Sequence, residues 1–223
     1  MPRRSLKGTC FSCKKEFSKS GMARHLAACK ERAKTIALGD RQKHAVRRRI
    51  LQLLVEGYDR PQYWKLVEVD ANIGLKKLDN YLRDFWLECC GHLSAFFIGD
   101  DQYGVTADSS MRMKSMRAKL GDLVGKGDCF GYDFGTTTTL RFEIIDEREG
   151  TIAANNIRLL AKNVVPDLRC ECDKPATLVC AQCIWETEEC WFCDDCADDH
   201  PCGEEMMLPN ADSPRVGMCS YGG

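Results

Sequence analysis

The sequence lacks any run of about eighteen apolar residues, the minimum length of a helix that crosses a membrane. Its first eight residues are basic, but they are not followed by the apolar stretch of a secretion signal. Apolar residues make up 44% and charged residues 29% of the chain, as is usual for globular proteins. These features predict a cytoplasmic protein with one ordinary core and small additional modules, or two modest domains.

Sequence motifs for nucleotide chemistry are also missing. Gly125-Lys126-Gly127, followed by Gly131, has neither phosphate-loop nor dinucleotide-loop spacing. Asp133-Phe134-Gly135 is similar to the metal-binding triplet of kinases, but no catalytic-loop motif accompanies it. His92 is the remaining candidate for a catalytic group, and we expect it to be a hydrogen-bonded structural residue. The sequence therefore predicts a protein that is not an enzyme, with an enzyme built around His92 as the third-ranked alternative.

Cysteine, in contrast, is abundant, with 15 copies. A secreted disulfide scaffold is one way to use so many cysteines. The odd count and the histidines placed among the cysteines instead favour metal binding in a reducing, cytoplasmic compartment. Zinc prefers four tetrahedral thiolate or imidazole ligands, and a site filled by four protein ligands has no open position for catalysis. The sequence therefore predicts structural zinc sites.

One predicted site lies near the N-terminus, where the pattern is Cys10-x2-Cys13-x11-His25-x3-Cys29. A hairpin would carry the two cysteines, and a helix would place His25 and Cys29 about one turn apart. The segment resembles the common DNA-binding zinc finger, with Cys29 in place of the second histidine and a central gap one residue shorter. Specific DNA binding by such fingers normally uses several in tandem, and this sequence has one.

The C-terminal part contains four further ligand pairs: Cys170 and Cys172, Cys180 and Cys183, Cys193 and Cys196, and His200 and Cys202. The segment resembles a B-box zinc module. This resemblance implies that the first and third pairs share one ion and the second and fourth pairs another. Pairing in sequential order is the rival, and the spare Cys190 and Cys219 could substitute for a ligand. Together with the finger, twelve ligands predict three zinc ions. B-box modules generally act in protein association.

The net charge of −1 conceals a strong polarity along the chain: residues 1–60 carry +11, residues 61–166 carry −2 and residues 167–223 carry −10. We expect a helix over about residues 41–56, with Val46, Ile50, Leu53 and Leu54 on one stripe. A basic head of this kind indicates contact with nucleic acid or, alternatively, a solvated face. The candidate contacts are Arg24, Lys43, Arg47, Arg48 and Arg49.

The middle of the chain alternates between strand and helix patterns. Residues 63–69 and 94–98 are rich in aromatic and β-branched side chains and predict strands. Leucines and aromatic residues over 75–89 predict an amphipathic helix of about four turns. A short helix is expected over 115–124 and a long bent strand over 129–145. We expect Cys89, Cys90 and Cys129 to be core residues. The pattern predicts an α+β domain with a mainly antiparallel sheet.

Four segments in this middle part resemble the plasmid pRiA4b ORF-3-like family. They are Tyr63-Trp64-Lys65-Leu66-Val67, the leucine-patterned segment 75–82, the stretch His92-Leu93-Ser94-Ala95-Phe96, and Tyr132-Asp133-Phe134-Gly135. Many relatives follow the glycine with Asp-x-Trp, whereas this chain has four threonines. The zinc-rich tail resembles that of some archaeal and bacterial members. The resemblance implies a fold over about residues 61–165 but no settled activity.

The sequence thus predicts four parts: a finger with a helical extension (1–38), a basic helix and linker (39–60), an α+β domain (61–166) and a double-zinc module with an acidic tail (167–223). Because the finger and the tail share no ligands with the middle, we expect each to unfold independently. The predicted function is that of a zinc-binding adaptor with a protein partner. Nucleic-acid binding through the basic head is the alternative.

Overall fold

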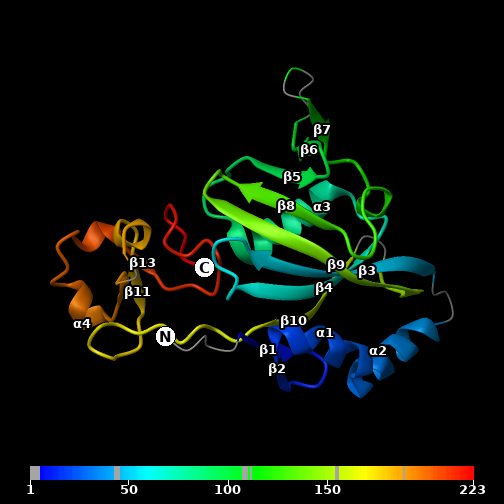
Figure 1. Cartoon of the computed structure of the whole chain (residues 1–223), viewed down its shortest axis with the longest axis horizontal. Coiled ribbons are helices and arrows are strands. Elements are labelled where there is room, and N and C mark those ends of the chain that lie inside the picture. Colours follow the sequence, from blue (N-terminus) through cyan, green and yellow to red (C-terminus); the bar gives the residue numbers. More distant parts are fainter. Residues whose placement is uncertain (1–5, 43–45, 107–109, 111, 154–155, 188) are drawn as a thin grey trace. The chain divides into compact units, whose positions relative to one another are not determined.

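The computed structural model describes residues 6–42, 46–106, 110, 112–153, 156–187 and 189–223. The chain forms two compact units (Figure 1). The sheet unit consists of Met1–Tyr81 and Leu93–Val164, and the tail unit consists of Leu82–His92 and Val165–Gly223. The tail unit therefore includes a short segment from the middle of the sequence. The sequence pattern predicts this segment as part of the α+β domain.

The sheet unit is built on a ten-stranded sheet with the order β2-β1-β10-β4-β3-β9-β8-β5-β6-β7. Neighbouring strands are antiparallel except β6 and β7, which run parallel. The predicted α+β class with a mainly antiparallel sheet is confirmed. The strands are β1 (Lys7–Cys10), β2 (Glu16–Ser18), β3 (Arg47–Gly57), β4 (Trp64–Asp70), β5 (Ser94–Ile98), β6 (Asp101–Gly104), β7 (Met113–Ser115), β8 (Cys129–Phe134), β9 (Thr138–Thr151) and β10 (Ile157–Asn163).

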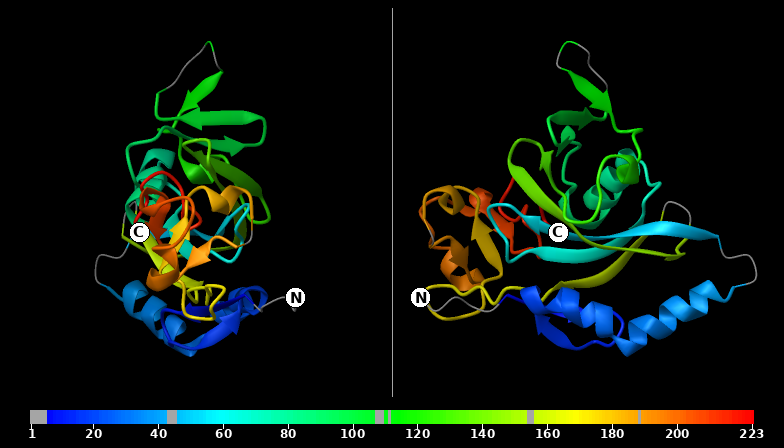
Figure 2. Two further views of the ribbon diagram at one scale, coloured as in Figure 1. Left: turned by 90° about the vertical axis from the view of Figure 1, so that its left-hand side faces the viewer. Right: turned by 45° about the vertical axis from the view of Figure 1, so that its right-hand side comes forward.

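Helices cover both faces of this sheet (Figures 1 and 2). The helices α1 (Lys19–Ala28) and α2 (Lys30–Asp40) lie on one face, where Met22 of α1 packs with Leu66 of β4. The helix α3 (Leu75–Leu82) lies on the other face, where Tyr132 of β8 donates a hydrogen bond to Asp79 of α3 at 2.7 Å. The helix α3 continues as a π-turn, η1 (Arg83–Leu87), so the predicted four-turn helix ends before Cys89.

The predicted helix over residues 41–56 is wrong, because residues 47–57 form the central strand β3. It pairs with strands on both sides: Ile50 lies opposite Asp70 of β4, and Gly57 lies opposite Leu140 of β9. Both faces of the sheet are covered here, so Leu51, Leu53 and their neighbours are buried on either side. A strand buried on both faces has a nearly continuous apolar run, and such a run also contains the helical spacing.

Two further predictions fail in the β8–β9 region. The expected bent strand over 129–145 is a hairpin of β8 and β9, with Gly135 and Thr136 in the left-handed region at φ 65° and 58°. The expected helix over 115–124 is reduced to a single turn of 3-10 helix, η2 (Leu120–Asp122). In the first case a tight turn at Gly135 and Thr136 reverses the chain between two antiparallel strands.

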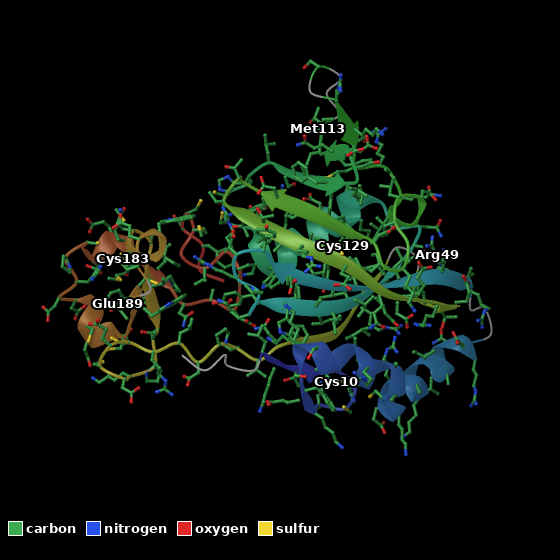
Figure 3. The ribbon with its side chains drawn as sticks, viewed as in Figure 1. Cys10, Arg49, Met113, Cys129, Cys183 and Glu189 are labelled. Atoms are coloured by element: carbon green, nitrogen blue, oxygen red, sulfur yellow. The ribbon has the colours of Figure 1, made fainter. Side chains whose placement is uncertain are left out.

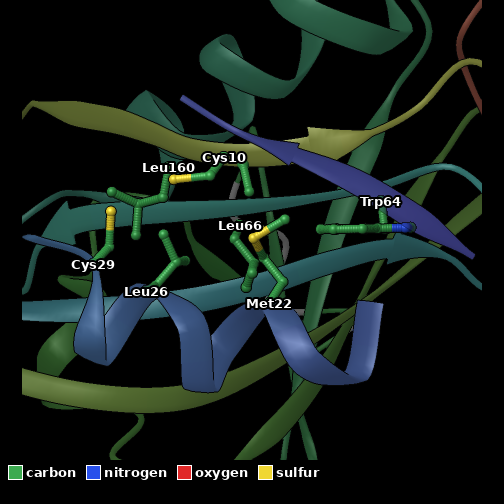
Figure 4. Packing of buried hydrophobic residues seen from close by; sticks show 8 residues of the cluster. Cys10, Met22, Leu26, Cys29, Trp64, Leu66 and Leu160 are labelled. Atoms are coloured by element: carbon green, nitrogen blue, oxygen red, sulfur yellow. The ribbon is translucent and has the colours of Figure 1, made fainter. Parts of the chain in front are cut away.

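The finger is part of the large sheet. Its strand β1 pairs with β10, and its helix buries Met22 and Leu26 against Trp64 and Leu160 of the sheet (Figure 4). The same cluster contains Leu66 and Ala161, and two of the finger's cysteines, Cys10 and Cys29. The finger and the sheet therefore share one hydrophobic core, whereas the sequence predicts two independent parts.

The tail unit has little regular structure. Its three-stranded sheet has the order β12-β11-β13, formed by β12 (Trp191–Phe192), β11 (Leu178–Cys180) and β13 (Met207–Pro209). The other elements are the π-turn η1 (Arg83–Leu87), the short helix α4 (Asp194–Ala197) and two turns of 3-10 helix, η3 (Cys183–Trp185) and η4 (Glu204–Met206).

Candidate metal centres

The finger brings its four predicted ligands together. Cys10 ends β1, Cys13 lies in the following turn, His25 lies on α1 and Cys29 caps the end of that helix. Their ligand atoms lie within 4.8 Å of one another, and the Cys13 sulfur lies 3.3 Å from Nε2 of His25. A tetrahedral zinc with Zn–S bonds of about 2.3 Å separates its ligand atoms by about 3.5–3.8 Å. The geometry therefore fits one ion with small adjustments.

The surroundings of His25 favour its metal-binding form. Its ring stacks on Phe17 with 3.7 Å between the ring centroids. Burial, and then the charge of Lys15, lower the pKa of the His25 imidazole below its ordinary value. A neutral imidazole is the form that binds metals, so the ring is ready to act as a ligand near neutral pH.

In the tail unit, Cys170, Cys172, Cys193 and Cys196 form a first cluster. The sulfurs of Cys172 and Cys193 lie 3.6 Å apart, which is close to the spacing at a tetrahedral zinc. Backbone N–H groups of Cys172 and Cys193 lower the pKa of the Cys170 thiol to about 6. Hydrogen bonds with the Cys172 and Cys193 sulfurs raise the pKa of Cys196 to about 12. Four thiolates so close together repel one another, and a divalent cation removes that repulsion.

The second tail cluster contains Cys180, Cys183, His200 and Cys202. The Cys183 sulfur is central to it, at 3.3 Å from Nε2 of His200 and 3.7 Å from the Cys202 sulfur. The backbone N–H of Cys183 donates to the Cys180 sulfur at 3.4 Å. Burial, and then the neighbouring Cys180 and Cys202 side chains, raise the pKa of Cys183 to about 12. Three thiols and an imidazole again form a closed four-ligand set.

The order of the ligand pairs in the two tail clusters is interleaved. The first and third pairs meet in one cluster and the second and fourth in the other. This is the grouping that the cross-braced arrangement predicts, and it differs from sequential pairing. Cys190 is buried and belongs to neither tail cluster, and its carbonyl accepts a hydrogen bond from the N–H of Cys180. With this grouping, an ion at each cluster would link both halves of the module.

A fourth cluster was not predicted. It contains Cys89, Cys90, His92 and Cys219, whose ligand atoms also lie within 4.8 Å of one another. The expectation that Cys89 and Cys90 are core residues is wrong, because Cys90 is exposed and Cys89 is half-buried. Cys129, the third cysteine expected in the core, is exposed on β8 (Figure 3). The signal in the sequence is Cys-Cys-x-His, together with an unassigned cysteine near the C-terminus.

All fifteen cysteines lie within the described residues, and none of them forms a disulfide bond. Together with four Cys/His clusters, this shows that the chain has the ligands for metal ions rather than a disulfide framework. Among the described residues, no helix is both long and apolar enough to cross a membrane.

The arginines predicted to contact nucleic acid do not share one helix face. On β3, Arg49 forms an ion pair with Glu147, with Nε 2.8 Å from its Oε2, and also donates to the Gly121 carbonyl (Figure 3). Arg48, on the opposite face of the strand, lies 3.4 Å from the buried Asp70 carboxylate. Arg47 and Arg24 are exposed, and Lys43 lies outside the described residues. Alternation along a strand therefore divides the basic run between two faces.

The start of the finger helix faces the sheet. A cavity of about 650 Å³ lies there, lined by α1 residues such as Ser20 and by sheet residues such as Leu54 and Arg141. Lys19 contacts the Glu56 carboxylate, and burial, followed by the charge of Arg141, lowers the pKa of Lys19 to about 8. In DNA-binding fingers the start of the helix contacts bases. Here, part of that surface is turned towards the protein.

No family model matches the sequence, and no curated protein matches it. Among solved structures, the chain is similar to a protein of unknown function, MM3350 from Methanosarcina mazei Go1. The TM-score is 0.44 and the identity 16%, over 51% of this chain and 68% of that chain. A similarity of this size carries neither fold nor activity from one protein to the other.

Proposed function

We propose that this chain is a zinc-binding protein whose metal sites are structural and whose role is to bind a protein partner. The observation that carries the proposal is that each predicted cluster has four nitrogen or sulfur ligands within 4.8 Å of one another. Zinc bound by four protein side chains has no position left for water or substrate. The ions would then stabilise the fold, and none of these sites would carry out catalysis.

Zinc fits these ligands better than other common ions. Thiolate and imidazole are the ligands that select zinc, whereas magnesium and calcium require oxygen ligands. Two of the three predicted clusters contain three cysteines and one histidine, and the third contains four cysteines. Both sets occur in tetrahedral structural zinc sites.

The acidic surface of the tail unit supports a basic protein partner. Residues 167–223 contain 13 acidic and 3 basic residues. Asp198 and Asp199 follow α4, Glu204 and Glu205 begin the next helical turn, and all four are exposed. A surface of one sign attracts a surface of the opposite sign and repels phosphate. The pairing of Arg48 and Arg49 with acidic side chains gives nucleic-acid binding less support than the charge pattern suggests.

Elemental analysis of the full chain, purified without added metal, tests the metal part of this proposal. We expect zinc at no less than three ions per chain, one for each predicted cluster. A Cys183→Ser variant should contain one ion fewer, because this residue belongs to a single cluster. Iron in place of zinc, or fewer than three ions per chain, would contradict the proposal.

A second measurement tests the partner. We expect proteins captured by the full chain to survive nuclease treatment and to be lost when Asp198, Asp199 and Glu204 are changed to their amides. A variant with the exposed Asp59 changed to Asn, in the sheet unit, controls for a general loss of charge. Loss of the captured proteins on nuclease treatment would indicate nucleic-acid binding instead.

A further inference from the structure

We propose a fourth zinc site in the tail unit, with Cys89, Cys90, His92 and Cys219 as its ligands. The sulfurs of Cys89 and Cys90 lie 3.3 Å apart. Nε2 of His92 lies 3.1 Å from the Cys90 sulfur and 3.2 Å from the Cys219 sulfur. The imidazole nitrogen therefore points between two sulfurs. Small outward shifts would accommodate zinc, whose ligand atoms lie about 3.5–3.8 Å apart.

The charge around the cluster suits a metal–thiolate centre. Arg215 is fully buried, and its Nε and Nη2 atoms donate to the Cys89 sulfur at 3.3 and 3.2 Å. Nη2 also lies 3.3 Å from the Cys219 sulfur. Neutral thiols are weak acceptors, whereas a buried cation requires negative charge nearby. Zinc with three thiolates and a neutral imidazole has a net charge of −1, which Arg215 balances.

The loop that carries three of the ligands is held in shape by hydrogen bonds. The Glu88 carboxylate accepts from the backbone N–H groups of Cys89 at 3.0 Å and Gly91 at 2.6 Å. Arg83 donates to Glu88 at 2.9 Å and to the His92 carbonyl at 2.6 Å. Gly91 has φ 77°, a conformation that favours glycine. The loop thus presents both sulfurs and the imidazole on one side.

The fourth ligand comes from a segment fixed to the turn that precedes this loop. The Trp86 carbonyl in η1 accepts from the hydroxyls of Ser213 at 2.7 Å and Tyr221 at 2.8 Å, and all three side chains are buried. Cys219 lies between these two residues, with its backbone in the left-handed region at φ 50°. A residue 127 positions away from His92 in the chain is thereby placed at the imidazole. An ion here would link the segment 88–92 to the C-terminal segment.

This site differs from the three predicted ones in its exposure. None of its four ligands is buried, and Cys90 and Cys219 are exposed, whereas the finger and each tail cluster have at least one buried cysteine. Chelators and oxidants reach exposed metal–thiolate groups first. The fourth ion should therefore be the first that a chelator removes.

Zinc counting on the full chain tests the site. We expect four zinc ions per chain in the unaltered protein and three in Cys219→Ser, one for each of the remaining clusters. The matched control is Cys129→Ser, because Cys129 is an exposed cysteine outside the four clusters, and this variant should retain four. Three ions in both the unaltered protein and Cys219→Ser would overturn the fourth site and leave the proposed function intact. Fewer than three in the unaltered protein would contradict both.

Labelling of thiols in the unaltered protein tests the same site without any substitution. Cys90, Cys129 and Cys219 are all exposed. With an alkylating reagent and peptide mapping, we expect Cys129 to be modified at once, and Cys90 and Cys219 only after a chelator is added. Equal modification of all three before chelation would overturn the proposal. So would recovery of Cys90 and Cys219 as a disulfide from freshly purified protein.

Discussion

Arg32 of α2 donates from Nη2 to Oε1 of Glu68 on β4, at 2.5 Å. The carboxylate is 1% exposed and also pairs with Arg148 of β9 and Arg158 of β10. One buried acid on the sheet thus joins the helix that follows the finger to three central strands. Removal of one partner from a buried ion pair leaves the remaining charges unbalanced, which costs more than a surface pair contributes.

We therefore expect Glu68→Gln to lower the free energy of unfolding by about 3 kcal/mol. The amide keeps the size of the side chain but loses the charge that three arginines surround. The matched control is Glu31→Gln, since Glu31 pairs with Lys34 on the exposed side of α2. That change should cost less than about 0.5 kcal/mol. Urea unfolding of both variants measures the difference, and equal midpoints would contradict the buried role of Glu68.

The same residue predicts a dependence on pH. Burial alone would raise the pKa of Glu68, but the hydrogen bonds and charges of Arg148 and Arg32 outweigh it and lower the pKa below its ordinary 4.5. A lowered pKa means that the Glu68 charge stabilises the fold fully at pH values above its pKa in the unfolded state. This stabilisation is lost as the pH falls through its pKa in the folded state. The difference in stability between the unaltered protein and Glu68→Gln should hold at neutral pH and shrink below about pH 4.5.

Unfolding curves of the two proteins across this range measure that difference. Both proteins should lose zinc in acid, because cysteine ligands must be deprotonated to bind it. The difference between the two curves therefore carries the result, rather than either curve alone. A difference that stays constant down to pH 3 would show that the Glu68 charge contributes nothing.

The metal clusters show what can be predicted from a sequence. Cys10 and Cys13, or Cys180 and Cys183, are separated by two intervening residues, so their spacing reports directly on a local turn. His92 and Cys219 are 127 positions apart, and no local pattern connects them. Their proximity depends on how the chain packs around Trp86, which spacing does not encode.

Secondary structure was predictable where a short run is rich in aromatic and β-branched residues. Residues 94–98 were predicted as a strand and form β5. On β3, apolar side chains occur on both faces, and Ile50, Leu53 and Leu54 happen to fit a helical stripe. Tertiary burial on both sides then outweighs the local pattern. The basic residues that were expected on a helix belong to a strand instead. They are therefore divided between two faces and do not form one basic surface.

The shared core predicts that the finger and the sheet unfold together. Leu26 of α1 is 1% exposed and packs in the cluster with Trp64 and Leu160. Leu26→Ala should lower the free energy of unfolding by about 2–5 kcal/mol, because it leaves a cavity between the finger and the sheet. Sheet signals and finger signals should shift by the same amount in thermal unfolding. A separate, earlier transition of the finger would show that the finger unfolds independently of the sheet, as the sequence predicts.

The close approach of β1 to Trp64 gives the last prediction. Gly8 pairs with Asn163 of β10, and a Cβ atom added to it would lie 2.3–2.4 Å from the Trp64 ring and 2.5 Å from the Lys162 carbonyl. The indole is fully buried and the carbonyl belongs to the neighbouring strand, so neither can move freely. Overpacking of this kind costs about 1–3 kcal/mol. We expect Gly8→Ala to lower the melting temperature and to weaken zinc binding by the finger.

The matched control for Gly8→Ala is Gly131→Ala on β8. A Cβ there meets its nearest neighbour, the Cβ of Phe97, at 3.8 Å, which is an ordinary contact. Alanine also restricts the unfolded chain more than glycine does, so this change should be neutral or slightly stabilising. Thermal unfolding followed by circular dichroism, with zinc release monitored by a metallochromic dye, distinguishes the two variants. If both behaved alike, the contact of β1 with Trp64 would not be what requires glycine at position 8.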